Sequence, residues 1–425
     1  MAGERKLKRL GEICEFRGGQ GFPQKHQGAI VGEYPFIKVS DMELPGNRHR
    51  ITRANHWIDE TTRKELRAKP HPATSTVFAK IGIALTYNRR RLLSRPTIVD
   101  NNMMAAVPIE SEVEPLFLYY LLKATDFNEV VSGTALPFIN GSDLAKMEVE
   151  VPPLAEQKAI AAVLGALDDK IELNRRMNAT LEAMARALFQ SWFVDFDPVR
   201  AKLDGRPPAA LDPATAALFP ASFQDSTAGH IPSGWRVMKV GEFIERLSVG
   251  QKYEQKTVSP VGKVPVLDQG KSGVIGFHNN EPGVTATLDK PVAVFANHTC
   301  YMRLITYSFS AIQNVLPFVG SGVDTFWAYY ATEGRLSFSE YKGHWPDFVI
   351  QESVVPPREL TDAFGRLAKP LVAKMRNNEE ESRTLATLRD TLLPKLLSGE
   401  LSLPAALLAA QAGVAGLESQ PEAVT

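Results

Sequence analysis

The sequence predicts a mixed α/β protein in which two α/β modules are separated by a pair of long coiled-coil helices, related by an internal repeat. A Pro-Pro segment followed by a long helical pattern occurs twice, at 151–154 and at 355–358. Both helical patterns carry an apolar seam in alternating steps of four and three residues. The segments before them contain short β-branched or aromatic runs broken by Gly, Pro and Asn, which is typical of strands and turns.

The two helical patterns correspond at an offset of 204 residues (355 − 151). The positions expected in the helix-pair interface are Ile160, Leu164, Leu167, Ile171, Asn174, Asn178, Leu181 and Leu188 of the first helix and Phe364, Leu371, Met375, Asn378, Leu385 and Leu392 of the second. Asn174 and Asn178 correspond to Asn378 and Ser382, and polar residues within such a seam fix its register at some cost in stability. Arg389 is the exception in the second seam. The two helices are therefore expected to pack together.

The first helix is expected to be unusually long. A helix from 156 to 192 would extend roughly 55 Å at about 1.5 Å per residue, which is more than one globular domain needs. The alternative is a buried helix of an ordinary all-α domain. The recurrence of the seam favours a spacer between two modules.

A second sequence match, between 10–13 and 240–243, lies at an offset of 230 rather than 204. The modules therefore differ in internal length, and a fixed offset does not align their interiors. We predict a first module at 1–152, a first long helix at 153–194, a linker at 195–234, a second module at 235–356, a second long helix at 357–401 and a C-terminal tail at 402–425. The linker is rich in Pro, Ala, Gly and Asp and is expected to be extended. The tail is expected to be frayed.

Composition limits the function classes. With 425 residues, 44% of them hydrophobic, the chain can form several domains with sizeable cores. Its 48 basic and 48 acidic residues cancel, so binding to a polyanion would depend on local patches. Cys14 and Cys300 indicate neither a disulfide framework nor a zinc site, because no His or Cys cluster lies near them. The charged start and the lack of a long apolar stretch lead us to expect a cytoplasmic protein without a membrane span.

The sequence lacks the motifs that three kinds of catalytic site require. An adenine methyltransferase needs a Gly-rich turn for the methyl donor and a Pro-Pro-aromatic loop for a flipped base, and neither occurs. The only P-loop-like segment, 270–272, has Pro265 where the first Gly should stand. Carboxylates and a Lys grouped on a strand, as a metal-dependent nuclease requires, are also missing. The histidines of the modules occur singly, so no catalytic residue and no metal site is predicted.

Residues that could contact nucleic acid are Arg, Lys, Asn and Gln in or beside loops, because these side chains bind phosphates and base edges. The candidates in the first module are Lys80, Asn88, Arg89, Arg90, Arg91 and Arg95, and those in the second are Lys252, Tyr253, Gln269, Lys271, His298 and Arg303. The alternative for the dense basic run at 89–91 is a solvated surface.

Three motifs carry a resemblance to a known family. The segments Pro152 to Gln157, Trp192 to Pro198 and Gly229 to Trp235, in this order, resemble those of the specificity subunit of type I restriction-modification systems. The resemblance implies two target-recognition domains, each followed by a conserved helix, with the two helices antiparallel. In the second repeat the segment 356–360 lacks the Glu-Gln pair of the first, which leaves open which helix start contacts a partner.

The family resemblance also implies a function. The chain would be a non-catalytic, sequence-specific DNA-recognition subunit that directs adenine methylation, with or without cleavage, by its partners. Those partners would be two methyltransferase subunits, with or without a nuclease-translocase subunit. S-adenosylmethionine, ATP and magnesium would be bound by the partners, and no cofactor by this chain.

The length of the spacer translates into an expectation for the target. About 50 Å corresponds to roughly 15 base pairs at about 3.4 Å each, so two modules on such a spacer would bind a bipartite target with a gap. Dissimilar interiors predict dissimilar half-sites.

Two other functions remain open from the sequence. One is a non-catalytic interaction scaffold with two peptide- or glycan-binding modules, which salt-dependent binding to duplex DNA would distinguish. The other is a self-sufficient methyltransferase or nuclease, which would show activity as the purified chain.

Overall fold

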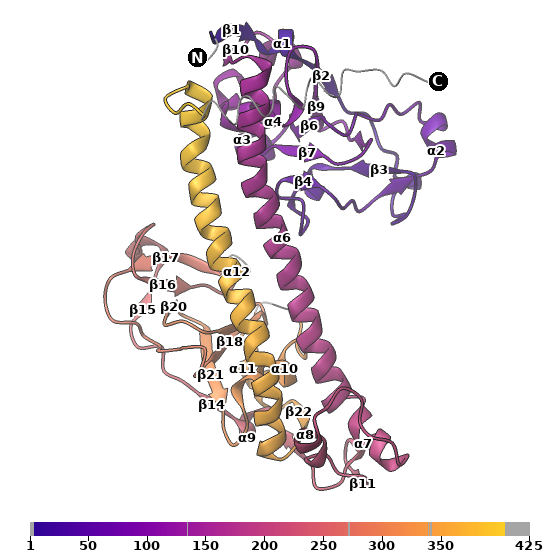
Figure 1. Cartoon of the computed structure of the whole chain (residues 1–425), viewed down its shortest axis with the longest axis vertical. Helices are drawn as coiled ribbons and strands as arrows, with labels where there is room; N and C mark the ends of the chain where they lie inside the picture. Colours follow the sequence, from indigo (N-terminus) through magenta and orange to yellow (C-terminus); the bar gives the residue numbers. More distant parts are fainter. Residues whose placement is uncertain (1–3, 134, 271–272, 339, 341, 404–425) are drawn as a thin grey trace, which may run out of the picture. The chain divides into compact units, whose positions relative to one another are not determined.

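The computed structural model describes residues 4–133, 135–270, 273–338, 340 and 342–403. It forms two compact units, a first unit of residues 1–174 and 381–425 and a second unit of residues 175–380 (Figure 1). Each unit contains part of both long helices, α6 (Leu154–Phe193) and α12 (Arg358–Ser398). Most of the predicted tail lies outside the described residues. No helix in the described part of the chain is long and apolar enough to cross a membrane.

The first unit contains three sheets. A two-stranded sheet joins β1 (Lys6–Arg9) to β10 (Glu148–Val151), immediately before α6. A five-stranded sheet has the order β2 (Cys14–Gly18), β9 (Met103–Pro108), β6 (Thr76–Ala79), β7 (Arg91–Leu93) and β4 (Arg50–Ile51). A three-stranded sheet has the order β5 (Trp57–Ile58), β3 (Tyr34–Ile37) and β8 (Ile98–Val99). The short helices are α1 (Leu10–Ile13), η1 (Gln24–His26), η2 (Val39–Glu43), α2 (Glu60–Glu65), α3 (Ile83–Thr86), α4 (Pro115–Ala124), η3 (Phe127–Val130) and α5 (Gly141–Leu144).

The second unit repeats this plan with shorter connections. The sheet of β13 (Arg236–Lys239) and β22 (Glu352–Val355) precedes α12. One four-stranded sheet has the order β14 (Ile244–Arg246), β21 (Val315–Gly320), β18 (Val292–Ala296) and β19 (Met302–Ile305). The other has the order β15 (Lys252–Tyr253), β20 (Ser310–Ile312), β16 (Val264–Leu267) and β17 (Val274–His278). The short helices within this plan are α9 (Val240–Phe243), η4 (Gln255–Thr257), α10 (Thr325–Thr332) and α11 (Trp345–Val349).

Strand register aligns the interiors of the two units, although no fixed offset does. Cys14 pairs with Pro108 in the first unit, and Ile244 pairs with Gly320 in the second, at offsets of 230 (244 − 14) and 212 (320 − 108). The pairs of β6 with β9 and of β18 with β21 give offsets of 217 (293 − 76) and 212 (318 − 106). The outer pairs, β1 with β10 and β13 with β22, give 230 and 204. The length differences therefore lie in connections between strands, while the pairing itself is retained.

The repeated segment at 10–13 and 240–243 marks a close helix contact in both units. A methyl group on Gly11 would lie 2.9 Å from Cβ of Ala145, and one on Gly241 would lie 3.3 Å from Cβ of Val349. Ala145 and Val349 are themselves 204 residues apart and follow or end the matching short helices α5 and α11. Glycine recurs at 11 and 241 because the neighbouring element leaves little room for a side chain.

The residues predicted to join the long helices are buried or half-buried. In the first unit Ile160 and Leu164 share a core cluster with Leu392, which packs against it. In the second unit Phe364 shares a core with Leu188 and Leu371. Within each unit the helices run antiparallel, as their contacts show: higher numbers on α6 meet lower numbers on α12.

The polar positions of the seam bond across the helix pair. In the first unit the Asn174 amide donates to the Glu381 carboxylate at 2.8 Å and to the Ser382 hydroxyl at 3.3 Å. In the second unit the Asn378 amide donates to Oδ1 of Asn178 at 2.8 Å. Position 174 of α6 corresponds to position 378 of α12 (174 + 204), and position 382 of α12 corresponds to position 178 of α6 (382 − 204). The pair 174–382 of the first unit is therefore equivalent to the pair 378–178 of the second. The repeat of polar residues thus corresponds to one hydrogen-bonding arrangement used twice.

The linker predicted to be extended is instead folded. It contains α7 (Asp197–Leu203), α8 (Pro213–Ala217) and a hairpin of β11 (Phe223–Ser226) and β12 (Gly229–Pro232). Val199, Phe219 and Ile231 are buried in the core of the second unit. Pro198 and Pro213 occupy the first turns of α7 and α8, where a missing N–H costs nothing, so here proline starts helices rather than marking an extended segment.

Candidate nucleic-acid interface

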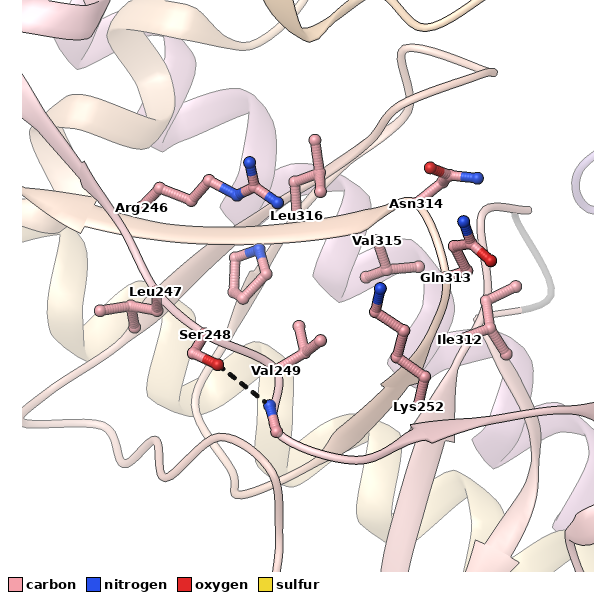
Figure 2. Close-up of a pocket in the computed structure, with 12 residues that line it drawn as sticks. Arg246, Leu247, Ser248, Val249, Lys252, Ile312, Gln313, Asn314, Val315 and Leu316 are labelled. Atoms are coloured by element: carbon pink, nitrogen blue, oxygen red, sulfur yellow. Dashed lines mark hydrogen bonds between the residues drawn. The ribbon is translucent and has the colours of Figure 1, made fainter.

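Each unit has a hollow between an edge strand of one sheet, with the segment that follows it, and a strand of a second sheet. These strands are β2 and β8 in the first unit and β14 and β20 in the second. The hollow of the first unit has a volume of about 410 Å³ and is lined by Arg17, Gly18, Gln20, Arg67, Lys69, Pro70, His71, Ile98 and Val99. That of the second unit has a volume of about 450 Å³ and is lined by Arg246, Leu247, Ser248, Val249, Gly250, Lys252, Ile312, Gln313, Asn314, Val315, Leu316 and Pro317 (Figure 2). We call them hollow 1 and hollow 2.

Hollow 1 is lined by positive charge. Arg17, Arg67 and Lys69 lie on its walls, and no carboxylate does. Arg17 forms an ion pair with Glu15 at 2.5 Å, whereas Arg67 and Lys69 are exposed and have no ion pair among the described residues. The Lys80 ammonium lies beside Gly18, since a methyl group there would be 3.6 Å from Nζ. A carboxylate-free wall of this kind attracts a polyanion.

Hollow 2 combines cations with carboxamides. Lys252, Gln313 and Asn314 direct their polar ends to one part of it, and Arg246 occupies another (Figure 2). The Arg246 guanidinium lies over the Trp345 ring, 5.7 Å from its centroid. Such side chains contact phosphates and base edges in protein–DNA complexes.

Arg90 and Asn88, predicted to contact DNA, have structural roles instead. Arg90 is 2% exposed, and its guanidinium carbon lies 3.6 Å from the Phe127 ring centroid. It donates to Oδ1 of Asn88 at 2.5 Å, and Asn88 donates to the carbonyl of Thr125 at 3.3 Å. Burial lowers the pKa of Arg90 to about 9. These two side chains hold the segment before β7 against η3, and so they are not available to DNA.

The remaining candidates of the basic run lie outside hollow 1. Arg89 forms an ion pair with Glu43 and stacks over Tyr87, 4.6 Å from the ring centroid. Arg91 donates to the carbonyl of Met42 at 3.2 Å, and burial lowers its pKa. Arg95 is exposed beside the Trp57 ring. Arg89 and Arg95 are accessible to a ligand, whereas the Arg91 guanidinium donates hydrogen bonds to two backbone carbonyls, those of Met42 and Arg90.

Of the predicted residues of the second unit that the structure describes, only Lys252 lines hollow 2. Tyr253 is buried and stacks on His278 with ring centroids 4.2 Å apart. The Arg303 guanidinium donates to the carbonyls of Gly273 and Asp268, both at 2.6 Å. Two other candidates, Gln269 and His298, are joined by a hydrogen bond from the His298 backbone N–H to the Gln269 side chain, and Lys271 lies outside the described residues.

Sequence reasoning missed Arg17, Gln20, Arg67 and Lys69 of hollow 1 and Arg246, Gln313 and Asn314 of hollow 2. They come from segments far apart in the chain, and no basic run marks them. The alternation of Arg67 and Lys69 before Pro70 was the one local signal.

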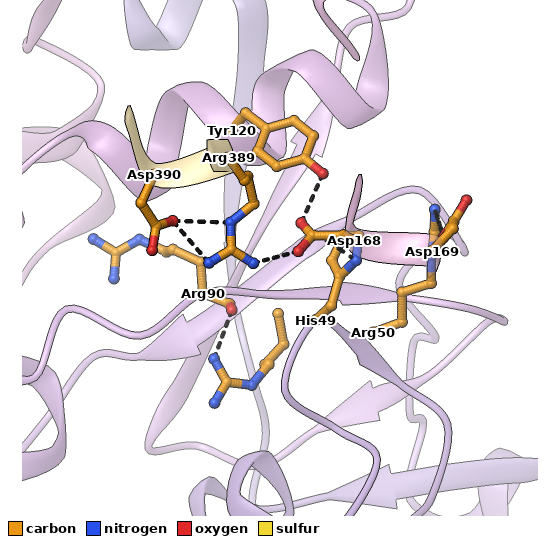
Figure 3. Close-up of polar contacts among 9 residues, drawn as sticks. His49, Arg50, Arg90, Tyr120, Asp168, Asp169, Arg389 and Asp390 are labelled. Atoms are coloured by element: carbon orange, nitrogen blue, oxygen red, sulfur yellow. Dashed lines mark hydrogen bonds and ion pairs between the residues drawn. The ribbon is translucent and has the colours of Figure 1, made fainter. Parts of the chain in front are cut away.

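The α/β module of the first unit contacts the long helices at a buried ion pair that joins them (Figure 3). The Arg389 guanidinium of α12 donates to Asp168 of α6, and the Tyr120 hydroxyl of α4 donates to the same carboxylate at 2.8 Å. The Asp168 side chain is 3% exposed. Arg389, the exception in the apolar seam, is therefore the counter-ion of a carboxylate on the facing helix.

Opposing effects set the pKa of Asp168. Burial alone would raise it, but nearby positive charge and hydrogen bonds outweigh burial and lower it. His49 lies 3.6 Å from the carboxylate, yet burial lowers the pKa of His49 to about 4, so it is neutral at pH 7. Arg389, which also donates a hydrogen bond to the carboxylate, is therefore the main cation that lowers the pKa of Asp168 at neutral pH, and Lys123 adds to its effect.

The start of each long helix bonds to its own module. The Gln157 side chain is buried, accepts from the backbone N–H of Glu114 at 2.8 Å and donates to the carbonyl of Pro152 at 2.8 Å. At the corresponding position, 204 residues on, the Thr361 hydroxyl accepts from the backbone N–H of Asp324 at 3.0 Å. The second repeat lacks the Glu-Gln pair of the first, and Thr361 there accepts the hydrogen bond that Gln157 accepts in the first unit.

Comparisons with known proteins agree with this architecture. Residues 3–183 match the family described as type I restriction modification DNA specificity domain. Across 93% of both chains, the protein is 24% identical to the type I restriction enzyme MjaIX specificity subunit of Methanocaldococcus jannaschii. The chain is therefore similar to type I restriction-modification specificity subunits over nearly its whole length. It is also 25% identical to the HindI specificity subunit of Haemophilus influenzae, over 72% of this chain and 81% of that one.

A solved structure shares the fold of this chain. The crystal structure of a type I restriction-modification S subunit from M. genitalium matches it with a TM-score of 0.58 at 14% identity, covering 95% of this chain and 97% of that one. The predicted mixed α/β fold with two modules and an antiparallel pair of long helices is confirmed.

Replacing Arg389 with Met is expected to lower the free energy of unfolding by about 3 kcal/mol at pH 7, because Asp168 would remain buried without its counter-ion. The folded-state pKa of Asp168 lies below the unfolded value, so this contribution is complete above pH of about 4 and is lost as pH falls through the folded pKa. Urea unfolding at pH 7 and at low pH measures both effects. Arg366→Met, at an exposed position of the same helix, is the control. An equal, pH-independent loss in both variants would contradict the role assigned to Arg389.

Replacing Arg90 with Ala is expected to destabilise the protein by about 3 kcal/mol, because the side chain fills space between Phe78 and Phe127. Arg95→Ala, which removes an exposed charge, should change the unfolding free energy by less than about 0.5 kcal/mol. Urea unfolding measures both values. Equal small effects would show that Arg90 is a surface residue after all.

Proposed function

We propose that this chain is a type I restriction-modification specificity subunit that binds duplex DNA through hollow 1 and hollow 2 and directs adenine methylation by partner subunits at a bipartite target. The observation that carries the proposal is the occurrence of a cation-lined hollow without a carboxylate in each unit. The net charge of the whole chain is zero. Local concentration of positive charge at both hollows is what phosphate binding requires.

The two hollows differ in chemistry, which supports recognition of dissimilar half-sites. Hollow 1 is dominated by Arg and Lys, whose bidentate or point-charge contacts suit phosphates and guanine. Hollow 2 adds two carboxamides, which suit adenine. Each unit would thus contact one half of the target, and the bases between the halves would not be contacted.

The chemistry of modification would belong to partners. Two methyltransferase subunits, with or without a nuclease-translocase subunit, would supply S-adenosylmethionine, ATP and magnesium sites in the cytoplasm. The described residues contain no group of three or more His, Cys, Asp or Glu side chains placed to hold a metal ion. This chain would supply specificity and position.

Exchange of one module tests the proposal. Residues 11–150 are replaced by the corresponding segment of a related specificity subunit with a different known target, and methylated adenines are mapped genome-wide in cells that contain the partner subunits. We expect one half of the target to change and the other to stay, since each unit has its own sheets and core. A change in both halves, or in neither, would contradict the assignment of one half-site to each unit.

Neutralising hollow 1 should weaken DNA binding in a salt-dependent manner. The double variant Arg67→Gln/Lys69→Gln, in the assembled methyltransferase complex, should reduce the slope of log affinity against log salt concentration by about 2, because two phosphate contacts are lost. Lys64→Gln/Lys146→Gln removes two exposed charges of the same unit outside hollow 1 and is the matched control. Identical slopes for the two double variants would rule out hollow 1 as the phosphate-binding surface.

A further inference from the structure

We infer that the turns at Gln313–Asn314 and Asn101–Asn102 are the base-recognising elements of the two units, each selecting an adenine–thymine pair through a carboxamide. This inference rests on the proposed function and adds the residues and the base to it.

The two turns occupy the same place in the fold. Each connects a strand of one sheet to an inner strand of the next sheet: β8 to β9 in the first unit and β20 to β21 in the second. Val99 pairs with Ile37, and Ala311 pairs with Leu267, so β8 and β20 correspond at an offset of 212. The pairing of β2 with β9 and of β14 with β21 gives the same offset. Asn101 therefore corresponds to Gln313, and Asn102 to Asn314.

The turn conformation accounts for only one of these four carboxamides. Asn314 has a φ of +68°, a conformation that Asn tolerates better than most residues. Asn101, Asn102 and Gln313 do not have a positive φ. The backbone conformation therefore does not require a carboxamide at all four positions. All four positions nevertheless carry one, although the interiors of the two units otherwise differ.

The carboxamides are available to a ligand. Asn101, Asn102 and Gln313 are exposed, and Asn314 is half-buried on the wall of hollow 2. The side-chain amides of Gln313 and Asn314 make no hydrogen bond with the residues that the structure describes. Figure 2 shows both amide groups at the end of hollow 2 where the Lys252 ammonium lies.

A lysine flanks each turn. Lys252 lines hollow 2 with Gln313 and Asn314. In the first unit the backbone N–H of Lys80 donates to the carbonyl of Asn102 at 2.8 Å, which places this lysine directly beside the turn. A phosphate contact by the lysine would hold the turn in register over the base edge. The adenine edge presents one donor and one acceptor in the major groove, and a carboxamide satisfies both at once.

Substitution of the carboxamides tests the inference in the intact methyltransferase complex. Gln313→Ala and Asn314→Gly remove the amides of the second unit, and glycine retains the positive φ. Asn101→Ala does the same in the first unit, and Asn377→Ala, at an exposed position of α12, is the matched control. The readouts are duplex affinity for the wild-type target and for targets with each base pair changed, together with the map of methylated adenines.

We expect Gln313→Ala or Asn314→Gly to reduce the preference for adenine by about 10- to 100-fold at one position of one half-site. Asn101→Ala should do so in the other half-site, with non-specific affinity and its salt dependence retained. Unchanged specificity in all three variants, while Arg67→Gln/Lys69→Gln still weakens binding, would overturn the inference and leave the proposed function standing. Salt-independent binding, or none, by the wild-type complex would remove the proposed function itself.

Discussion

The structure depends on the need of each long helix to bury its apolar seam. A single helix of this length with one apolar face is not stable in water, and most of its stability comes from packing that face against another element. Each unit meets this need by combining part of α6 with part of α12. The first unit is completed last along the chain, because its part of α12 follows the whole second unit in the sequence.

Polar groups within the seam determine which helix positions meet. The hydrogen bonds of Asn174 in the first unit and of Asn178 in the second connect residues that a shift of one helical turn would separate. A buried amide that loses its partner costs about 1–3 kcal/mol, so an apolar seam that could slide is restricted to one register. The ion pair of Arg389 with Asp168 adds a second restriction, which also fixes the module of the first unit to the helices.

Sequence patterns were sufficient for the features that are local or periodic. The seam, its polar interruption and the repeated segment at 10–13 and 240–243 each have a direct counterpart in the structure. The folded linker was missed, because Pro198 and Pro213 are compatible with a helix start as well as with an extended segment. The alignment of the module interiors was also missed, since the offset changes at each connection while strand register is retained.

The candidate site was less predictable than the fold. The run at 89–91 looks like a binding surface in the sequence, but Arg90 is covered by Phe127, which lies 37 residues further along the chain. Conversely, hollow 1 combines residues around 17, 67 and 98 that no sequence motif relates to one another. The burial of a side chain and the meeting of distant segments at one surface are properties of the tertiary structure. The density of charge along the sequence therefore neither identifies nor excludes a residue that contacts DNA.

The central claim is that two separate sets of residues contact two separate halves of one DNA target. Selection of bound duplexes from a random pool by the complex of this chain with the proposed methyltransferase subunits tests it most directly. The account predicts two short, dissimilar motifs at one fixed separation, with no preference among the bases between them. One continuous motif, or two motifs at variable separation, would contradict it.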